Sequence, residues 1–186
     1  MRIAHVISIL SEMAASMRGH SNFFMDMAMN PEFAEGVLDL VTDFFIAFYD
    51  EALNTAGEFI DIVFFGDDYG MQNGTIISPP LWRKMIKPRL ARLIAKIKSY
   101  PDVHYQHHSC GAIAPIIPDL VEIGVDILNP IQPSAKGMDP AKIKHEFGAP
   151  LVLHGAVDQQ GTLPHGTPEE VRAEVVSRMR DLAPGG

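Results

Sequence analysis

The stretch VHYQHHSCGAIAPIIPDLVEIGVDILNP, residues 103–130, contains two short apolar runs separated by an amphipathic segment. The runs at 103–107 and 125–128 contain β-branched and aromatic residues, which favour strands. The segment from about 112 to 123 has the pattern of a helix that ends at Gly124. The stretch therefore predicts a strand, a helix and a second strand, which is the unit that builds parallel sheets.

The same alternation extends in both directions along the chain. Further apolar runs at 60–65 and 151–153 predict two more strands, and residues 8–17 predict a helix. Four helix starts combine a capping residue with a proline: Asn30-Pro31, Ser78-Pro79, Asp139-Pro140 and Thr167-Pro168. Thr167 also has a glutamate three residues later, which predicts a capping box. The basic residues between 83 and 98 predict the solvated face of one helix.

Alternating strands and helices indicate an α/β fold with a parallel sheet, for which two architectures compete. A nucleotide-binding doubly wound sheet would need a Gly-x-Gly-x-x-Gly turn after an early strand, and the sequence has none. The (β/α)8 TIM barrel is therefore favoured. A closed barrel takes about 250 residues, whereas this chain has 186. We expect residues 1–186 to form a single partial barrel domain that lacks N-terminal strands and the last strand.

A partial barrel would leave strands at both edges of the sheet without partners. Such edges expose backbone hydrogen-bonding groups, so we expect the isolated chain to associate with itself or to be poorly soluble.

Composition and charge restrict the partners and the compartment. The chain has 15 Lys and Arg against 23 Asp and Glu, a formal net charge of −8, and no basic cluster that would bind nucleic acid. The single cysteine, Cys110, excludes an internal disulfide and favours a cytoplasmic location. No apolar run reaches the roughly 20 residues of a membrane span, and the first ten residues do not form a signal peptide.

Polar residues follow each of the four predicted strands, where barrel enzymes carry their catalytic groups. In chain order the candidates are Asp67, Asp68 and Gln72; His108 and Cys110; Asn129 and Gln132; and His154 and Asp158. Polar residues at four successive strand ends favour a functional site over a purely structural role.

His108 and Cys110 form the sharpest of these candidates. Alternate residues of an extended segment share a face, so both side chains are predicted to point inward while His107 points toward the helices. An imidazole and a thiol at this spacing suit one tetrahedral zinc ion, which needs at least one more ligand. The competing interpretation is a small buried thiol beside a hydrogen-bonded core histidine.

The other candidates have weaker patterns. Asp67 and Asp68 must face opposite ways at a strand end, so only one of them enters the site, and either one also suits a helix cap. Asn129 and Gln132 offer uncharged groups for positioning a substrate. His154 is either a ligand or general acid, or a structural residue at a strand end.

Several motifs together resemble a known family. They are GDDYGMQ (66–72), ISP (77–79) with WR (82–83) and KP (87–88), HSCG (108–111), and GVDILNP (124–130) with Gln132, preceded by RG (18–19) and NPE (30–32). This combination resembles the uroporphyrinogen decarboxylase superfamily of barrel enzymes and is similar, more narrowly, to its cobalamin-dependent methyltransferase branch. The resemblance covers nearly the whole chain.

The resemblance implies a chemistry. In that branch a His-x-Cys motif and a distal cysteine bind zinc, and the zinc activates a thiol that takes a methyl group from a methyl-corrinoid protein. It thus implies zinc ligation by His108 and Cys110, with a third ligand beyond Gly186, and a corrinoid protein and a small-molecule methyl acceptor as partners. We assign Asp68 to catalysis with this pair, and Asp67, Gln72, Asn129, Gln132, His154 and Asp158 to substrate binding.

Two other functions stay open at this point. One is a metal-free decarboxylase that acts on a tetrapyrrole or another carboxylated substrate. The other is an inactive fragment or a metal-binding module.

Overall fold

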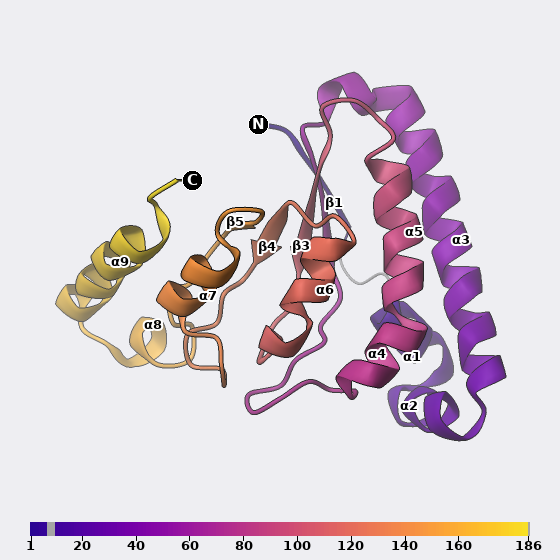
Figure 1. Ribbon diagram of the computed structural model, residues 1–186, viewed down its shortest axis with the longest axis horizontal. Helices are drawn as coiled ribbons and strands as arrows, with labels where there is room; N and C mark the ends of the chain where they lie inside the picture. Colours follow the sequence, from indigo (N-terminus) through magenta and orange to yellow (C-terminus); the bar gives the residue numbers. More distant parts are fainter. Residues whose placement is uncertain (7–9, 186) are drawn as a thin grey trace.

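A computed structural model describes residues 1–6 and 10–185, and its strands form a single parallel sheet (Figure 1). The strands are β1 (Ile3–Val6), β2 (Ile62–Gly66), β3 (His104–His108), β4 (Ile127–Asn129) and β5 (Val152–Leu153), and every neighbouring pair is parallel. Strands β2 to β5 confirm the four strands predicted from the apolar runs. The sequence pattern did not predict β1, which is four residues long and contains a polar histidine.

The order of the strands in the sheet identifies the architecture. Spatial order follows chain order, β1-β2-β3-β4-β5, so each crossover places the next strand beside the last on the same side. A doubly wound sheet would instead reverse direction at a switch point. Stepwise winding of parallel strands with intervening helices is the pattern of a (β/α)8 barrel, and the described strands form a segment of one.

The helices that the structure describes are α1 (Ser11–Arg18), α2 (His20–Met29), α3 (Pro31–Ala56), α4 (Pro79–Met85), α5 (Lys87–Ile97), α6 (Ile117–Glu122), α7 (Pro140–Phe147), α8 (Thr162–His165) and α9 (Pro168–Leu182), with 3-10 turns η1 (Gly57–Phe59) and η2 (Ala114–Ile116). Four helices, α3, α4, α7 and α9, begin where a capping residue followed by proline predicts. The side chains of Ser78, Asp139 and Thr167 each accept a first-turn amide, and Thr167 completes its capping box with Glu170. Asn30 precedes α3 as predicted but makes no side-chain cap.

Three helix predictions need correction. The helix predicted from about 112 to 123 is shorter, because the segment begins with the 3-10 turn η2 and only 117–122 form the helix α6. The predicted helix at 8–17 is α1, which starts at Ser11, and residues 7–9 lie outside the described part. The basic residues between 83 and 98 lie on two helices, α4 and α5, rather than one. They are also not uniformly solvated, because Arg89 is buried and donates to both carboxylate oxygens of Asp39 on α3 at 2.8 Å.

The two faces of the sheet differ in character. On the outer face, Phe65 of β2 packs edge-on against Phe45 and Tyr49 of α3, which runs alongside α5 in Figure 1. On the inner face, the strand register places Phe64, Gln106 and Ile127 in one row. The inner face becomes polar toward the carboxyl ends of the strands, where the candidate residues lie.

No helix among the described residues is both long enough and apolar enough to span a lipid bilayer.

Candidate metal centre

The carboxyl ends of β2 and β3 bring three potential ligands together. Asp68 follows the end of β2 by two residues, His108 is the last residue of β3, and Cys110 follows two residues later. One ligand atom from each residue lies within 4.8 Å of the other two, and all three side chains are half-buried. The prediction that His108 and Cys110 share a face is confirmed, because the Cys110 Sγ lies 3.4 Å from the His108 Nε2.

The donor set fits a tetrahedral ion. Nitrogen, sulfur and oxygen ligands bound at about 2.0–2.3 Å to one tetrahedral zinc lie roughly 3.5 Å from each other. The Sγ–Nε2 separation of 3.4 Å and the 3.7 Å between the His108 Nε2 and the Asp68 Oδ1 both match this spacing. An imidazole, a thiol and a carboxylate are ligands that zinc takes in proteins.

Asn129 at the end of β4 fixes the orientation of the His108 ring. The Asn129 Nδ2 donates to the backbone oxygen of His154 at 3.1 Å, so its Oδ1 is the atom that faces His108. The His108 Nδ1 lies 2.7 Å from that oxygen and therefore donates its proton there. This leaves the lone pair of Nε2 directed at Cys110 and Asp68, the arrangement found behind metal-binding histidines.

Main-chain contacts hold the Asp68 and Cys110 segments together. The Cys110 backbone N–H donates to the Asp68 Oδ1 at 2.7 Å, and the Asp68 backbone N–H donates to the Glu12 Oε1 at 3.0 Å. Gly70 and Gly111 face each other where the two segments cross, and a Cβ on Gly70 would lie 2.5 Å from the Cys110 oxygen. Gly111 also has φ of +83°, which other residues rarely adopt.

The electrostatics of the cluster keep the thiol protonated in the absence of a cation. Burial raises the pKa of Cys110 to about 11, and the negative charge of Asp68 and a hydrogen bond with it add to the shift. A thiolate at neutral pH would therefore need a positive charge beside it, which a bound metal supplies.

Asp67 and His107 lie on the opposite face, as alternation along the strands requires. Asp67 is fully buried and accepts from the Ser11 N–H, the Ser11 hydroxyl, the Glu12 N–H and the Tyr69 hydroxyl at 2.8–3.0 Å. Burial raises the pKa of Asp67 to about 6. The structure thus places Asp67 at the N-terminus of α1, away from the Asp68 cluster.

His107 is buried in the aromatic layer between the sheet and the helices. Its ring stacks on Tyr69 at 5.4 Å between centroids, and its Nδ1 lies 3.0 Å from the Tyr105 hydroxyl. Burial lowers the pKa of His107 to about 3, so the ring is neutral. His107 therefore has a packing role, while its neighbour His108 faces the site.

The remaining candidates lie around the cluster at different distances from it. The Gln132 Oε1 accepts from the Gly111 N–H at 2.5 Å, and the His154 Nδ1 lies 2.9 Å from the Gln106 Nε2 on the inner face. Gln72 donates to the Ser134 backbone oxygen, further out on the rim. Asp158 accepts from the Gln160 N–H within its own loop and is not part of the metal cluster.

The sequence analysis did not identify Glu12 or Gln106. Glu12 lies 56 residues before Asp68, and only the pairing of β1 with β2 brings α1 to this position. Alternation along β3 places Gln106 on the same face as His108, so the strand pattern could have predicted that Gln106 lies on the inner face.

Together, the fold and the cluster define a segment of a (β/α)8 barrel with a candidate metal centre at the carboxyl ends of its strands. The family model described as uroporphyrinogen decarboxylase (URO-D) matches residues 6–185. The chain belongs to this family, as its motifs predicted.

A solved structure, a methyltransferase from Methanosarcina mazei, is similar to this chain with a TM-score of 0.75 and 22% sequence identity. The match covers 94% of this chain and 49% of that one, so the chain spans about half the length of its structural relative. At this identity the likeness shows a shared fold. No curated protein matches the sequence.

Proposed function

We propose that this protein is a zinc-dependent methyltransferase that moves a methyl group between a methyl-corrinoid protein and a thiol acceptor. The observation that carries the proposal is the cluster of Asp68, His108 and Cys110 at the strand ends, with donor separations that fit one tetrahedral ion. Membership of the uroporphyrinogen decarboxylase family and the fold shared with a protein called a methyltransferase support it.

Each of the three residues would supply one ligand atom to the metal. His108 would hold the ion through Nε2, Cys110 through Sγ and Asp68 through a carboxylate oxygen. An acceptor thiol would take the remaining position, since catalytic zinc sites have three protein ligands and one open position. Zinc bound here would lower the pKa of a coordinated thiol and make the thiolate available as the nucleophile at neutral pH. Asp68 would thus take the third protein position that the resemblance had assigned to a more distal ligand.

The surrounding residues hold and orient these ligands. Asn129 keeps the His108 proton on Nδ1, and the Cys110 N–H holds the Asp68 carboxylate by a hydrogen bond. Gln132 holds the Gly111 N–H, immediately after Cys110. The corrinoid protein would dock over the strand-end rim, because the metal cluster lies there, and we place this reaction in the cytoplasm.

Zinc content tests the proposal directly. We expect the purified protein to bind about one zinc ion and Cys110→Ser and His108→Gln to lose it while the far-ultraviolet circular dichroism stays unchanged. His104→Gln is the matched control, because His104 lies at the other end of the same strand, is exposed and should leave zinc binding intact. Full zinc retention by Cys110→Ser would refute the proposed centre.

The family description favours a second candidate, a metal-free decarboxylase of a carboxylated substrate. Such a substrate needs cationic partners, and the described residues that line the cavity beside Asp68, between α1, α2 and the segment after β2, include no lysine or arginine. Decarboxylation by protein from which zinc has been stripped would favour this candidate. Methyl transfer by a longer gene product, but not by this chain, would instead identify the chain as an inactive fragment.

A further inference from the structure

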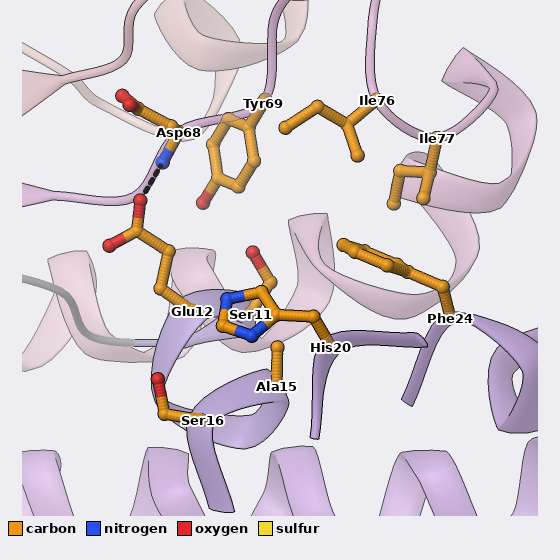
Figure 2. Close-up of a pocket in the computed structure, with 10 residues that line it drawn as sticks. All are labelled: Ser11, Glu12, Ala15, Ser16, His20, Phe24, Asp68, Tyr69, Ile76 and Ile77. Atoms are coloured by element: carbon orange, nitrogen blue, oxygen red, sulfur yellow. Dashed lines mark hydrogen bonds between the residues drawn. The ribbon is translucent and has the colours of Figure 1, made fainter. Parts of the chain in front are cut away.

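A cavity of about 320 Å³ lies beside the metal cluster, between α1, α2 and the segment that follows β2 (Figure 2). Its described lining consists of Ser11, Glu12, Ala15, Ser16, His20, Phe24, Asp68, Tyr69, Ile76 and Ile77. This volume is at the small end of the range for small-molecule sites. None of the residues assigned to substrate binding from the sequence lines it.

The cavity has one apolar wall and one polar wall. In Figure 2 the ring of Phe24 and the branched side chains of Ile76 and Ile77 gather on one side, and Glu12 lies on the other with Asp68 beyond it. The lining therefore suits a compact molecule with an apolar body and a polar end.

The charge at the polar wall is negative. Glu12 and Asp68 each contribute a carboxylate, and among the described lining residues there is no lysine or arginine. A ligand with a carboxylate, sulfonate or phosphate group would meet repulsion there without a compensating fixed cation. A cation would gain from the carboxylates and from the aromatic face of Phe24.

Glu12 connects this cavity to the metal cluster. Its Oε1 accepts from the Asp68 N–H at 3.0 Å, and its charge is close enough to raise the pKa of the Cys110 thiol. A molecule in the cavity with its polar end toward Asp68 would therefore reach the cluster.

We propose that the cavity binds a small organic cation with a compact apolar body and no anionic group. The role of this cation rests on the proposed function, in which it is the methyl acceptor, an aminothiol in chemical class. Its sulfur would form the new S–CH3 bond as the Co–CH3 bond of the methyl-corrinoid protein breaks, the bonding electron pair would stay on cobalt, and the thiol proton would pass to solvent. Its binding to the cavity does not depend on the metal.

Three probes of equal shape and different charge test the proposal: choline, its neutral isostere 3,3-dimethylbutan-1-ol, and the anion 3,3-dimethylbutanoate. The intrinsic fluorescence of Trp82, the only tryptophan, reports binding because its ring lies 5.4 Å from that of Tyr69 in the cavity wall. Calorimetry of the same samples gives the affinities. We expect choline to bind about tenfold more tightly than the neutral isostere, and the anion to bind most weakly.

Two variants locate the binding. Glu12→Gln keeps an acceptor for the Asp68 N–H but removes the charge, and we expect it to lower the preference for choline to about two- to fivefold, because Asp68 and Phe24 remain. Glu32→Gln is the matched control, because Glu32 is an acidic first-turn residue of α3 outside the cavity lining. Phe24→Leu keeps an apolar side chain without an aromatic face, and we expect it to weaken choline binding about two- to fivefold with little change for the neutral isostere.

The outcomes separate this proposal from the proposed function. Equal binding of choline and its neutral isostere, tighter binding of the anion, or no binding of any probe would each overturn the inference. A choline preference that is undiminished in both Glu12→Gln and Phe24→Leu would overturn it as well. Zinc content measured on the same samples tests the metal centre independently, so each proposal can fail alone.

Discussion

His107 and His108 are adjacent in β3 and yet have opposite chemical surroundings. His107 is buried between Tyr69 and Tyr105, whereas His108 is half-buried and has the Asn129 amide on one ring nitrogen and Cys110 on the other. The difference arises from the face of the strand that each side chain occupies. At this scale, the ability of an imidazole to bind a metal depends on what its second nitrogen contacts.

Asn129 provides the test of that dependence. We expect Asn129→Leu to weaken zinc binding about 10- to 100-fold, because the His108 Nδ1 proton loses its acceptor and the ring its orientation. Asn129→Asp retains an acceptor oxygen for the His108 Nδ1 proton and should bind zinc more tightly than the leucine variant does. Competition with a chromogenic zinc chelator measures both, and equal affinity in the leucine variant and the wild type would contradict the positioning role.

The segments that follow β2 and β3 pack directly against each other through their backbones. The Ala112 N–H donates to the Met71 oxygen at 2.8 Å, the Tyr69 N–H donates to the Ser109 hydroxyl at 2.9 Å, and Gly70 lies against Gly111. Because the two backbones are in contact at Gly70 and Gly111, a side chain at either glycine would push the segments apart and increase the distance between Asp68 and Cys110.

We therefore expect Gly70→Ala to lower the free energy of unfolding by about 1–3 kcal/mol and to weaken zinc binding, since its Cβ would collide with the Cys110 oxygen. Gly74→Ala is the control in the same segment, because a Cβ there meets no atom within 4 Å. Urea titration measures the stability and chelator competition the affinity. Identical behaviour of the two alanine variants would show that the close approach has no influence on the site.

Element boundaries also show what sequence patterns predict and what they miss. Capping residues with proline located α4, α7 and α9, because that signal is local. The same-face position of His108 and Cys110 followed from strand alternation for the same reason. By contrast, the contact of Glu12 with Asp68 depends on how α1 folds back over the sheet, and no short-range pattern contains that information.

At the scale of the whole molecule, one parallel sheet carries the helices, and its first and last described strands, β1 and β5, each pair on one side only. Ile3 of β1 is 46% exposed and Val152 of β5 is 48% exposed, so apolar side chains accompany the unpaired backbone at both edges. Sheet edges of this kind pair with other chains.

We expect the free chain to self-associate as its concentration rises, with sedimentation velocity giving a weight-average mass above 20.5 kDa. Val152→Lys should reduce the association, because charged residues on an edge strand oppose pairing. Phe44→Lys is the control, since Phe44 is 62% exposed on α3, far from the edge in sequence. A concentration-independent monomer would contradict this expectation.

The contacts of Asp67 have a consequence for the order in which the site is assembled. His108 and Cys110 are two residues apart and become neighbours as soon as β3 is extended. The contact between Ser11 and Asp67, by contrast, joins residues that are 56 positions apart in the sequence. Contacts between distant residues close later than local ones, because more chain entropy is lost in closing the larger loop. We therefore expect a refolding chain to acquire the imidazole–thiol pair early and the Ser11 wall of the cavity late, so that partly folded molecules would hold two of the three metal ligands before the cavity has formed.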